Sequence, residues 1–358
     1  MATLLTPGPV PVPPWVQAAM QQPVIHHRTP EFEAFYQSFL GDLRYVFQTS
    51  GAVAASLGSG TFGVEMAMYS LFQKGDKIAV LDMGKFSGRW ADYGEVLGCE
   101  VIRLQKPWGE TWHVDELMEK LKPHGQLKGI VVTHSETSTG TIVDLEAIAS
   151  KLRVAYPEIL IVVDAITSVG AMPYYHEAWG IDCTVTASQK ALMNPAGLVL
   201  FAVSENGRQA MRPNDPGDFQ HVENYLTSAE KYSFPFTAPV IPLYGIAAAL
   251  AYIKKETLPV IWQACHQSAQ VFRRGVEEIG GEVFSQYPTD SLTAFMMKDG
   301  DIHALKSILE VRYGWKLSGG QGELKGKILR ISHMAEAHEG IMQQVLADLK
   351  LSQARLRA

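Results

Sequence analysis

Short runs of β-branched and other apolar residues alternate with longer helix-like stretches along most of this 358-residue chain. The runs are residues 77–81, 100–104, 129–132, 160–163, 184–186 and 197–203. Runs that are apolar throughout are typical of strands buried on both faces, and the helical stretches between them supply the crossovers that parallel strands need. The pattern therefore predicts a doubly wound α/β domain with a large, mostly parallel sheet.

A second, smaller region is expected to begin near residue 244. Helices are predicted there at residues 244–255, 262–279, 302–311 and 338–349, with strands at 293–297 and 327–331. The proline-rich start should be extended, because proline fixes φ and removes an N–H donor. We expect an N-terminal arm at residues 1–20, a large domain at 21–243, and a connecting helix with a small α+β domain at 244–358.

Composition excludes several classes of partner. A net charge of −6 provides no basic surface for nucleic acid or an anionic membrane, and no apolar run approaches the roughly 20 residues of a membrane span. Three scattered cysteines, Cys99, Cys183 and Cys265, make neither a disulfide framework nor a zinc cluster, which favours the reducing cytoplasm. The start has no basic and no apolar segment, so we expect no signal peptide.

Chemically capable residues follow the predicted strands, at the edge where a sheet of this kind binds its ligands. They are Phe86 after 77–81, Thr137 after 129–132, Asp164 after 160–163, and Gln189 and Lys190 after 184–186. The loop Gly58-Ser59-Gly60-Thr61 precedes another predicted helix. The sequence therefore predicts one ligand site at this edge.

The glycine loop is a candidate anion site. Free backbone N–H groups and the positive end of the helix dipole favour phosphate at such a position. A tight turn without a ligand is the alternative. The glycine spacing matches neither a P-loop nor a dinucleotide fingerprint, which argues against an NAD-dependent dehydrogenase.

Asp164 and Lys190 are charged residues placed directly after apolar strands, where a buried charge is unfavourable unless it is paired. Asp164 could pair with the protonated nitrogen of a pyridine ring, or it could cap a following helix. Lys190 could be a Schiff-base amine with a lowered pKa, or an ordinary surface lysine. Because the two follow neighbouring strands, they can face one ligand from two sides.

Three further residues have both a functional and a structural interpretation. Phe86 could stack on a planar ring or simply pack. Thr137 offers a hydroxyl to a phenolate or phosphate oxygen, or stabilises a turn. Arg330 lies inside an apolar strand and needs an anionic partner, which is either a substrate carboxylate or a structural salt bridge.

With these residues, the chain resembles the class V, fold-type I pyridoxal-phosphate-dependent aminotransferases, specifically the alanine–glyoxylate / serine–pyruvate branch, over nearly its whole length. The most specific motifs are His134-Ser135-Glu136-Thr137-Ser138-Thr139-Gly140 and Ser188-Gln189-Lys190. Others are Leu5-Thr6-Pro7-Gly8-Pro9, Gly58-Ser59-Gly60-Thr61, Gly84-Lys85-Phe86, Val163-Asp164-Ala165 and Arg330-Ile331-Ser332-His333-Met334.

The resemblance implies a pyridoxal 5'-phosphate cofactor bound in a homodimer with shared sites. Lys190 would be the Schiff-base lysine and proton carrier, and Asp164 would pair with the ring nitrogen. Phe86 would stack on the ring, and Thr137 would bond its phenolate oxygen. The implied phosphate ligands are Ser59, Gly60, Thr61, Gln189 and, toward the neighbouring subunit's cofactor, Thr237.

On the substrate side, the resemblance implies that Arg330 binds the substrate carboxylate, with Gly8 nearby. No second arginine for a dicarboxylate is evident. We therefore expect ping-pong transfer of an amino group from a small amino acid, such as alanine, serine or glycine, to a 2-oxo acid such as glyoxylate or pyruvate. Three departures from the family pattern, Phe234, Ala196 and Ser332, leave the substrate open.

Two alternatives remain at this point. A lyase resembling the cysteine desulfurases would share the fold, but it would need a nucleophilic cysteine on a mobile loop. A non-catalytic subunit-type relative would keep the fold without the reaction. An amino-acid-dependent change in the absorbance of bound cofactor would separate the aminotransferase from both.

Overall fold

A seven-stranded sheet forms the centre of the computed structural model, which describes residues 3–298 and 301–357. The strand order is β2-β10-β9-β8-β5-β3-β4. The bounds are β2 (Ala52–Gly58), β3 (Lys77–Asp82), β4 (Glu100–Gln105), β5 (Gly129–Thr133), β8 (Leu160–Asp164), β9 (Cys183–Ala187) and β10 (Gly197–Val203). β10 runs antiparallel to β2 and β9, and the remaining pairs are parallel. The predicted large, mostly parallel sheet is confirmed.

The six predicted strands are present, but β2 was not predicted. Its sequence, Ala-Val-Ala-Ala-Ser-Leu-Gly, contains one β-branched residue, and alanine favours helices when it is considered alone. Antiparallel pairing with β10 along its whole length gives the segment its extended form, and Ala54 and Ala55 are fully buried. Tertiary context therefore overrides local propensity here.

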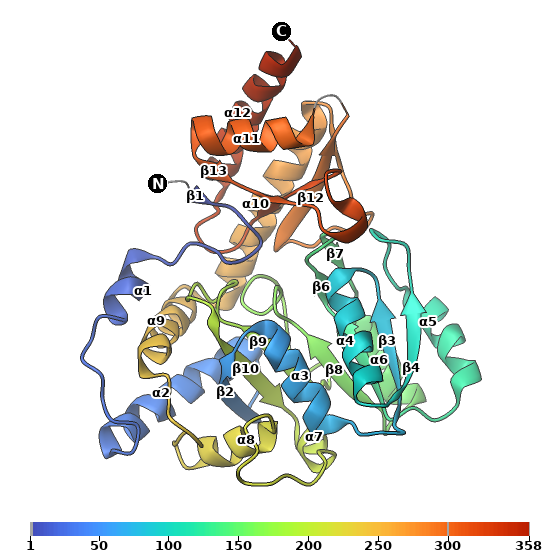
Figure 1. Cartoon of the computed structure of the whole chain (residues 1–358), viewed down its shortest axis with the longest axis vertical. Coiled ribbons are helices and arrows are strands. Elements are labelled where there is room, and N and C mark those ends of the chain that lie inside the picture. The colour runs from blue at the N-terminus through green and yellow to red at the C-terminus, as the bar shows by residue number, and fades with distance from the viewer. Residues whose placement is uncertain (1–2, 299–300, 358) are drawn as a thin grey trace.

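Helices cover the sheet on both sides. The bounds are α2 (Pro30–Phe47), α3 (Gly60–Leu71), α4 (Lys85–Val96), α5 (Val114–Leu121), α6 (Leu145–Ala155), α7 (Glu205–Gln209) and α8 (Val222–Glu230). Figure 1 shows α3 and α4 on the near face. N-cap side chains define where two of these helices begin: Thr29 caps α2 ahead of Pro30, and Asp144 caps α6.

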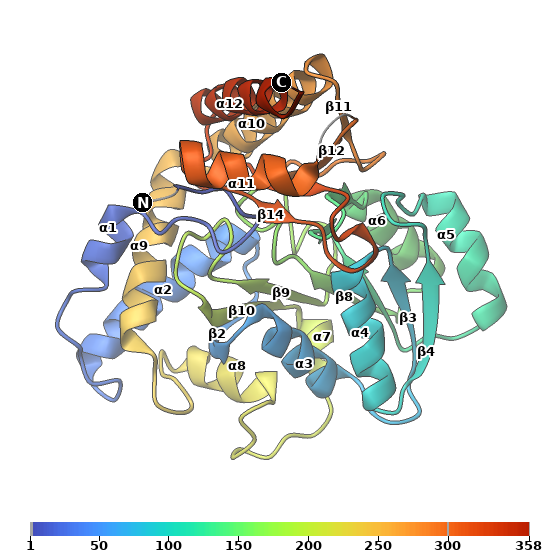
Figure 2. The ribbon, with the colours of Figure 1, turned by 45° about the horizontal axis from the view of Figure 1, so that its top comes forward.

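A second sheet lies beyond the upper edge of the first (Figures 1 and 2). It is antiparallel, with the order β11-β12-β15-β14. The bounds are β11 (Gly281–Val283), β12 (Leu292–Met297), β14 (Ser318–Gly319), β15 (Leu329–Ser332), α10 (Leu258–Glu278), α11 (Ile302–Tyr313) and α12 (Glu339–Arg357). The helix α9 (Val240–Glu256) precedes this region. The division of the chain at residue 244 stays a prediction.

The N-terminal arm crosses from one sheet to the other. Its first strand, β1 (Thr3–Leu4), pairs in parallel with β13 (Trp315–Lys316), and Leu5 belongs to the apolar cluster of the C-terminal region. Farther along, Val10 N–H donates to the Gln189 carbonyl in the turn that follows β9, before α1 (Pro14–Ala19) begins. The arm therefore links both parts of the molecule next to Lys190.

Among the helices of residues 3–298 and 301–357, none is both long enough and apolar enough to cross a membrane.

The close packing of α3 against the sheet gives a stability prediction. A Cβ added at Gly63 would meet Val199 Cγ1 at 2.3 Å and Val185 Cγ1 at 2.9 Å, whereas one at Gly41 in α2 would meet nothing within 4 Å. Gly63→Ala should destabilise the protein by roughly 1–3 kcal/mol through overpacking. Gly41→Ala, the matched control, should stabilise it by about 0.5–1 kcal/mol through helix propensity. Urea unfolding measures both, and equal effects would contradict this packing.

Candidate active site

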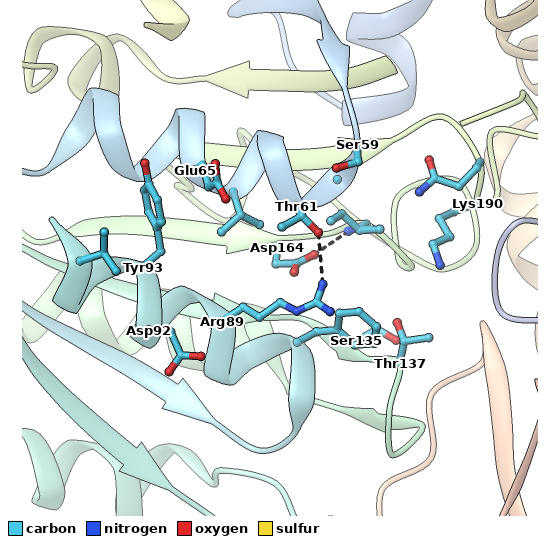
Figure 3. Close-up of a pocket in the computed structure, with 16 residues that line it drawn as sticks. Ser59, Thr61, Glu65, Arg89, Asp92, Tyr93, Ser135, Thr137, Asp164 and Lys190 are labelled. Carbon is cyan, nitrogen blue, oxygen red and sulfur yellow. Dashed lines mark hydrogen bonds between the residues drawn. The ribbon is translucent and has the colours of Figure 1, made fainter. Parts of the chain in front are cut away.

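A cavity of about 420 Å³ opens between α3, α4 and the ends of the parallel strands (Figure 3). Most of the predicted site residues line it: Ser59, Gly60, Thr61, Phe86, Thr137, Asp164, Gln189 and Lys190. They come from five separate stretches of chain. The register explains part of this convergence, because Asp164 at the end of β8 pairs with Thr133 of β5 and with Val185 of β9.

Lys190 follows β9 and lies against the N-terminal arm. Its Nζ donates a hydrogen bond to the Pro7 carbonyl, and a Cβ added at Gly8 would meet the same Nζ at 2.2 Å. Burial and the nearby Arg330 guanidinium lower the pKa of Lys190 to about 8, against the opposing effect of Asp164. A lysine with this pKa has a substantial fraction of neutral amine near neutral pH, which a surface lysine lacks.

Asp164 is 6% exposed at the end of β8. Its Oδ2 accepts a hydrogen bond from Trp90 Nε1 at 3.2 Å, and its Oδ1 accepts one from Ile166 N–H at 3.0 Å. Burial raises the pKa of Asp164 to about 6, although these hydrogen bonds oppose the rise. No α-helix follows it in the described chain before β9, so the helix-cap interpretation is wrong. The site therefore holds a carboxylate that a cation would stabilise.

The glycine loop begins α3. Ser59 is the N-cap and accepts a hydrogen bond from Phe62 N–H at 3.3 Å. The N–H groups of Gly60 and Thr61 lie in the first turn, where a helix offers no internal acceptor. On the facing side, Gln189 Oε1 is buried without a hydrogen-bond partner in the part of the chain that the structure describes. The free N–H groups of α3 can hold an anion. The Gln189 side chain can add to them only with its NH₂ group turned inward, since its oxygen is an acceptor.

Phe86 lies in the first turn of α4 and lines the cavity with Ile166. The Arg89 guanidinium lies 4.9 Å from the centre of the Phe86 ring, and its Nη1 donates to Thr61 Oγ1 at 3.1 Å. Figure 3 shows Arg89 pointing across the cavity toward Thr61. Arg89 therefore brings a positive charge to the side of the cavity where α3 begins.

Thr137 and Arg330 meet through the backbone. Arg330 Nη1 donates to the Thr137 carbonyl at 2.9 Å, while Nε and Nη2 donate to the Gly319 carbonyl. Arg330 is 5% exposed, and burial lowers its pKa to about 10. Among residues 3–298 and 301–357, no carboxylate lies within salt-bridge distance of its guanidinium. The structural salt bridge considered from sequence is therefore absent there.

Three predicted site residues, Arg330, Gly8 and Thr237, are not among those that line the cavity. Arg330 contacts the cavity-lining Thr137 through the hydrogen bond described above. Gly8 contacts Lys190 from the arm, and Thr237 is exposed on the turn before α9. Among the departures from the family pattern, Phe234 is buried between Tyr36 and Tyr225.

Four residues at the site were given no role from sequence, although the first three belong to the family motifs: Arg89, Trp90, Glu136 and Ile166. Trp90 was accessible from sequence, because it lies four residues after Phe86 on the same helix and so shares its face. Arg89 and Glu136 depend on contacts between distant segments, which no spacing reveals.

The three cysteines are buried and unpaired. Burial raises the pKa of Cys99 to about 11 and that of Cys265 to about 12, and it also raises the pKa of Cys183. A thiol of this kind is a poor nucleophile, and none of the three lines the cavity. The lyase alternative therefore lacks its essential group.

Comparison with known proteins agrees with this geometry. The chain is 32% identical to a protein from Synechococcus sp. named soluble hydrogenase, small subunit, over 93% of this chain and 88% of that one. It is 31% identical to an L-aspartate–glyoxylate aminotransferase from Paracoccus denitrificans, covering 97% and 92%. The solved structure of an alanine–glyoxylate aminotransferase from Nostoc sp. matches with a TM-score of 0.92 and 28% identity, covering 98% and 95%.

A family model also matches most of the chain. The family described as Aminotransferase class-V matches residues 20–335, which include every cavity-lining residue named above. The resemblance and the fold class predicted from sequence are thus confirmed. The chain belongs to the class-V aminotransferase family and is a transaminase.

Proposed function

We propose that this transaminase binds pyridoxal 5'-phosphate covalently through Lys190 and transfers amino groups between small amino acids and 2-oxo acids. The observation that carries the proposal is the pair of Lys190 and Asp164 in one cavity. A buried amine of lowered pKa and a buried carboxylate of raised pKa are there in reach of a single ring-sized ligand.

The residues present fit this cofactor. The first turn of α3 and the unpartnered Gln189 oxygen provide a polar cradle at one end, suited to a phosphate once the Gln189 amide turns its nitrogen inward. Phe86 and Ile166 provide apolar walls, and Asp164 provides an acceptor for a protonated ring nitrogen. When bound, pyridoxal phosphate supplies an aldehyde that takes up the amino group and a ring that withdraws electrons.

Each polar residue has a task that its surroundings support. Lys190, neutral near its pKa of about 8, accepts and returns the proton at the substrate Cα. Asp164, held by Trp90 and Ile166, keeps a ring nitrogen protonated. Arg330, fixed by two carbonyl groups, binds the substrate carboxylate. Thr137 Oγ1 lies 3.2 Å from Thr167 Oγ1 and offers a hydroxyl to the ring's phenolate oxygen.

A small substrate is favoured by the distribution of positive charge. Arg89 lines the cavity, but its hydrogen bond to Thr61 holds it at the side where α3 begins, which we assign to the phosphate. Arg330 is then the cation left for the substrate. Alanine, serine and glycine as donors, and glyoxylate or pyruvate as acceptors, suit one carboxylate clamp. The alanine–glyoxylate name of the Nostoc protein supports this choice.

A homodimer is the proposed functional unit, with Thr237 reaching the neighbouring subunit's cofactor phosphate. Thr237 is exposed beside a group of stacked aromatic side chains, Phe62, Phe219 and Phe236, of which Phe219 is 39% exposed. A second copy would cover this apolar surface in a two-fold pair. A mass of 39.4 kDa by light scattering at micromolar concentration would contradict the dimer.

The three unpaired cysteines support a cytoplasmic location.

Amine transfer can be followed directly with labelled nitrogen. We expect the protein, supplied with pyridoxal phosphate, to move ¹⁵N from alanine or serine to glyoxylate, detected as ¹⁵N-glycine by mass spectrometry. Arg330→Ala should lower kcat/KM for the donor roughly 30-fold or more, because a charge-assisted contact is lost. The exposed Arg274→Ala is the matched control and should have no effect. An absence of transfer with every donor, aspartate included, would favour a non-catalytic subunit.

Asp164 should oppose stability while it supports cofactor binding. Its pKa of about 6 lies above the usual 3.8, so its ionisation disfavours the folded apoprotein increasingly from about pH 4 to pH 6, and fully above that. Asp164→Asn should therefore raise the stability of the apoprotein at pH 7.5 by on the order of 1–2 kcal/mol, with no gain at pH 4. Cofactor affinity should fall at least about tenfold, since a charged partner is lost.

Urea unfolding at the two pH values measures the first effect, and titration with pyridoxal phosphate measures the second. A variant less stable than the wild type at pH 7.5, or one with unchanged affinity, would count against an ion pair between Asp164 and the ring.

A further inference from the structure

Glu136 is a fully buried carboxylate that the proposed reaction does not use. It lies in β6 (Ser135–Glu136), a short strand paired with β7 (Thr141–Ile142), and its exposed fraction is 0%. Within the described ranges, 3–298 and 301–357, it forms no salt bridge with a lysine, arginine or histidine. The Arg330 guanidinium interacts with Glu136 electrostatically without a salt bridge, so this buried carboxylate also needs several N–H or O–H groups to donate to it.

Two of those donors come from the start of α4 and two come from Ser138. Phe86 N–H donates to Glu136 Oε2 at 3.1 Å, and Ser87 N–H donates to the same oxygen at 2.8 Å. Ser138 donates to Oε1 through its N–H at 3.0 Å and its hydroxyl at 2.6 Å. Lys85 N–H, the remaining donor of this turn, donates to Ser138 Oγ at 3.0 Å. The Glu136–Ser138 segment thus satisfies the first three N–H groups of α4.

α4 depends on this external cap because it has none of its own. Its N-cap residue is Gly84, which has no side chain to accept a hydrogen bond. A Cβ at Gly84 would meet Glu136 Cγ and Ser138 Oγ, each at 2.6 Å, so the glycine permits the carboxylate to approach. α3 is the contrast, because Ser59 caps it from within and leaves the N–H groups of Gly60 and Thr61 facing the cavity. The first N–H groups of α3 are therefore free to bind a ligand, whereas those of α4 are already bonded to Glu136 and Ser138.

Phe86, which lines the cavity, lies in this first turn of α4. Glu136 accepts a hydrogen bond from the backbone N–H of Phe86, so it fixes the backbone position from which the Phe86 ring projects to line the cavity. We propose that Glu136 is a positioning residue, which fixes Phe86 at the cavity wall for stacking against the cofactor ring. The inference rests on the proposed function, since it needs a cofactor in this cavity.

A double-mutant cycle on cofactor affinity tests this role in the full-length apoprotein. Glu136→Gln replaces an acceptor oxygen with an NH₂ group facing N–H donors, and it should raise the Kd for pyridoxal phosphate about tenfold or more. If Glu136 acts through Phe86, the same substitution in a Phe86→Ala background should raise the Kd less than about threefold, because coupled residues are non-additive. The circular dichroism of the bound cofactor at saturation should also change with Glu136→Gln and not with the control below.

Asp301→Ala is the matched control. It removes a carboxylate that caps α11 through His303 and Ala304 N–H, far from the cavity. This variant should lose stability and keep the wild-type Kd. Should Glu136→Gln fail to fold, Ser138→Ala removes one donor to the carboxylate and the acceptor of Lys85 N–H, and should raise the Kd about threefold with the same dependence on Phe86.

An equal effect in both backgrounds, or an unchanged Kd in the single variants, would overturn the positioning role while leaving the cofactor assignment intact. A wild-type protein that does not bind pyridoxal phosphate would overturn both.

Discussion

Parallel pairing of β5, β8 and β9 brings the carboxyl ends of three strands to one edge of the sheet, and the candidate site depends on this arrangement. Asp164 ends the middle strand, so its carboxylate lies at the centre of the edge and is buried from both sides. Thr137 follows one neighbouring strand, and Lys190 follows the other. Chemical groups more than 50 residues apart thereby line one cavity.

Burial at this edge gives the charged groups their reactivity. The same removal from water lowers the pKa of Lys190 and raises that of Asp164, so each is displaced toward its neutral form. Such groups do not stabilise the apoprotein. Trp90 holds Asp164 by a hydrogen bond, and the Pro7 carbonyl on the arm holds Lys190. The Thr137 carbonyl holds the nearby Arg330 in the same way. A ligand that brings a ring cation and a phosphate satisfies what the fold leaves unsatisfied.

Much of the fold could be predicted from sequence, because short runs that are apolar throughout, alternating with helical stretches, are typical of buried parallel strands. β2 could not, since its alanines become a strand only through pairing with β10. The site residues next to strand ends were accessible for the same topological reason, and Lys190 and Asp164 line one cavity as expected. Glu136 belongs to the motif at residues 134–140, but no local pattern in the sequence predicts its hydrogen bonds with the start of α4, about 50 residues away. Thr237 remains a prediction that only a second copy of the chain can test.

Reductive trapping of the adduct between Lys190 and pyridoxal phosphate tests whether Lys190 holds the cofactor as a buried amine. Apoprotein is mixed with pyridoxal phosphate between pH 6 and pH 10, reduced with borohydride at early times, and mapped by peptide mass spectrometry. We expect the pyridoxyl label on Lys190, with an initial rate that rises through a midpoint at about pH 8, because the neutral amine reacts. A label on another lysine, or a midpoint near the ordinary lysine value of about 10.4, would contradict it.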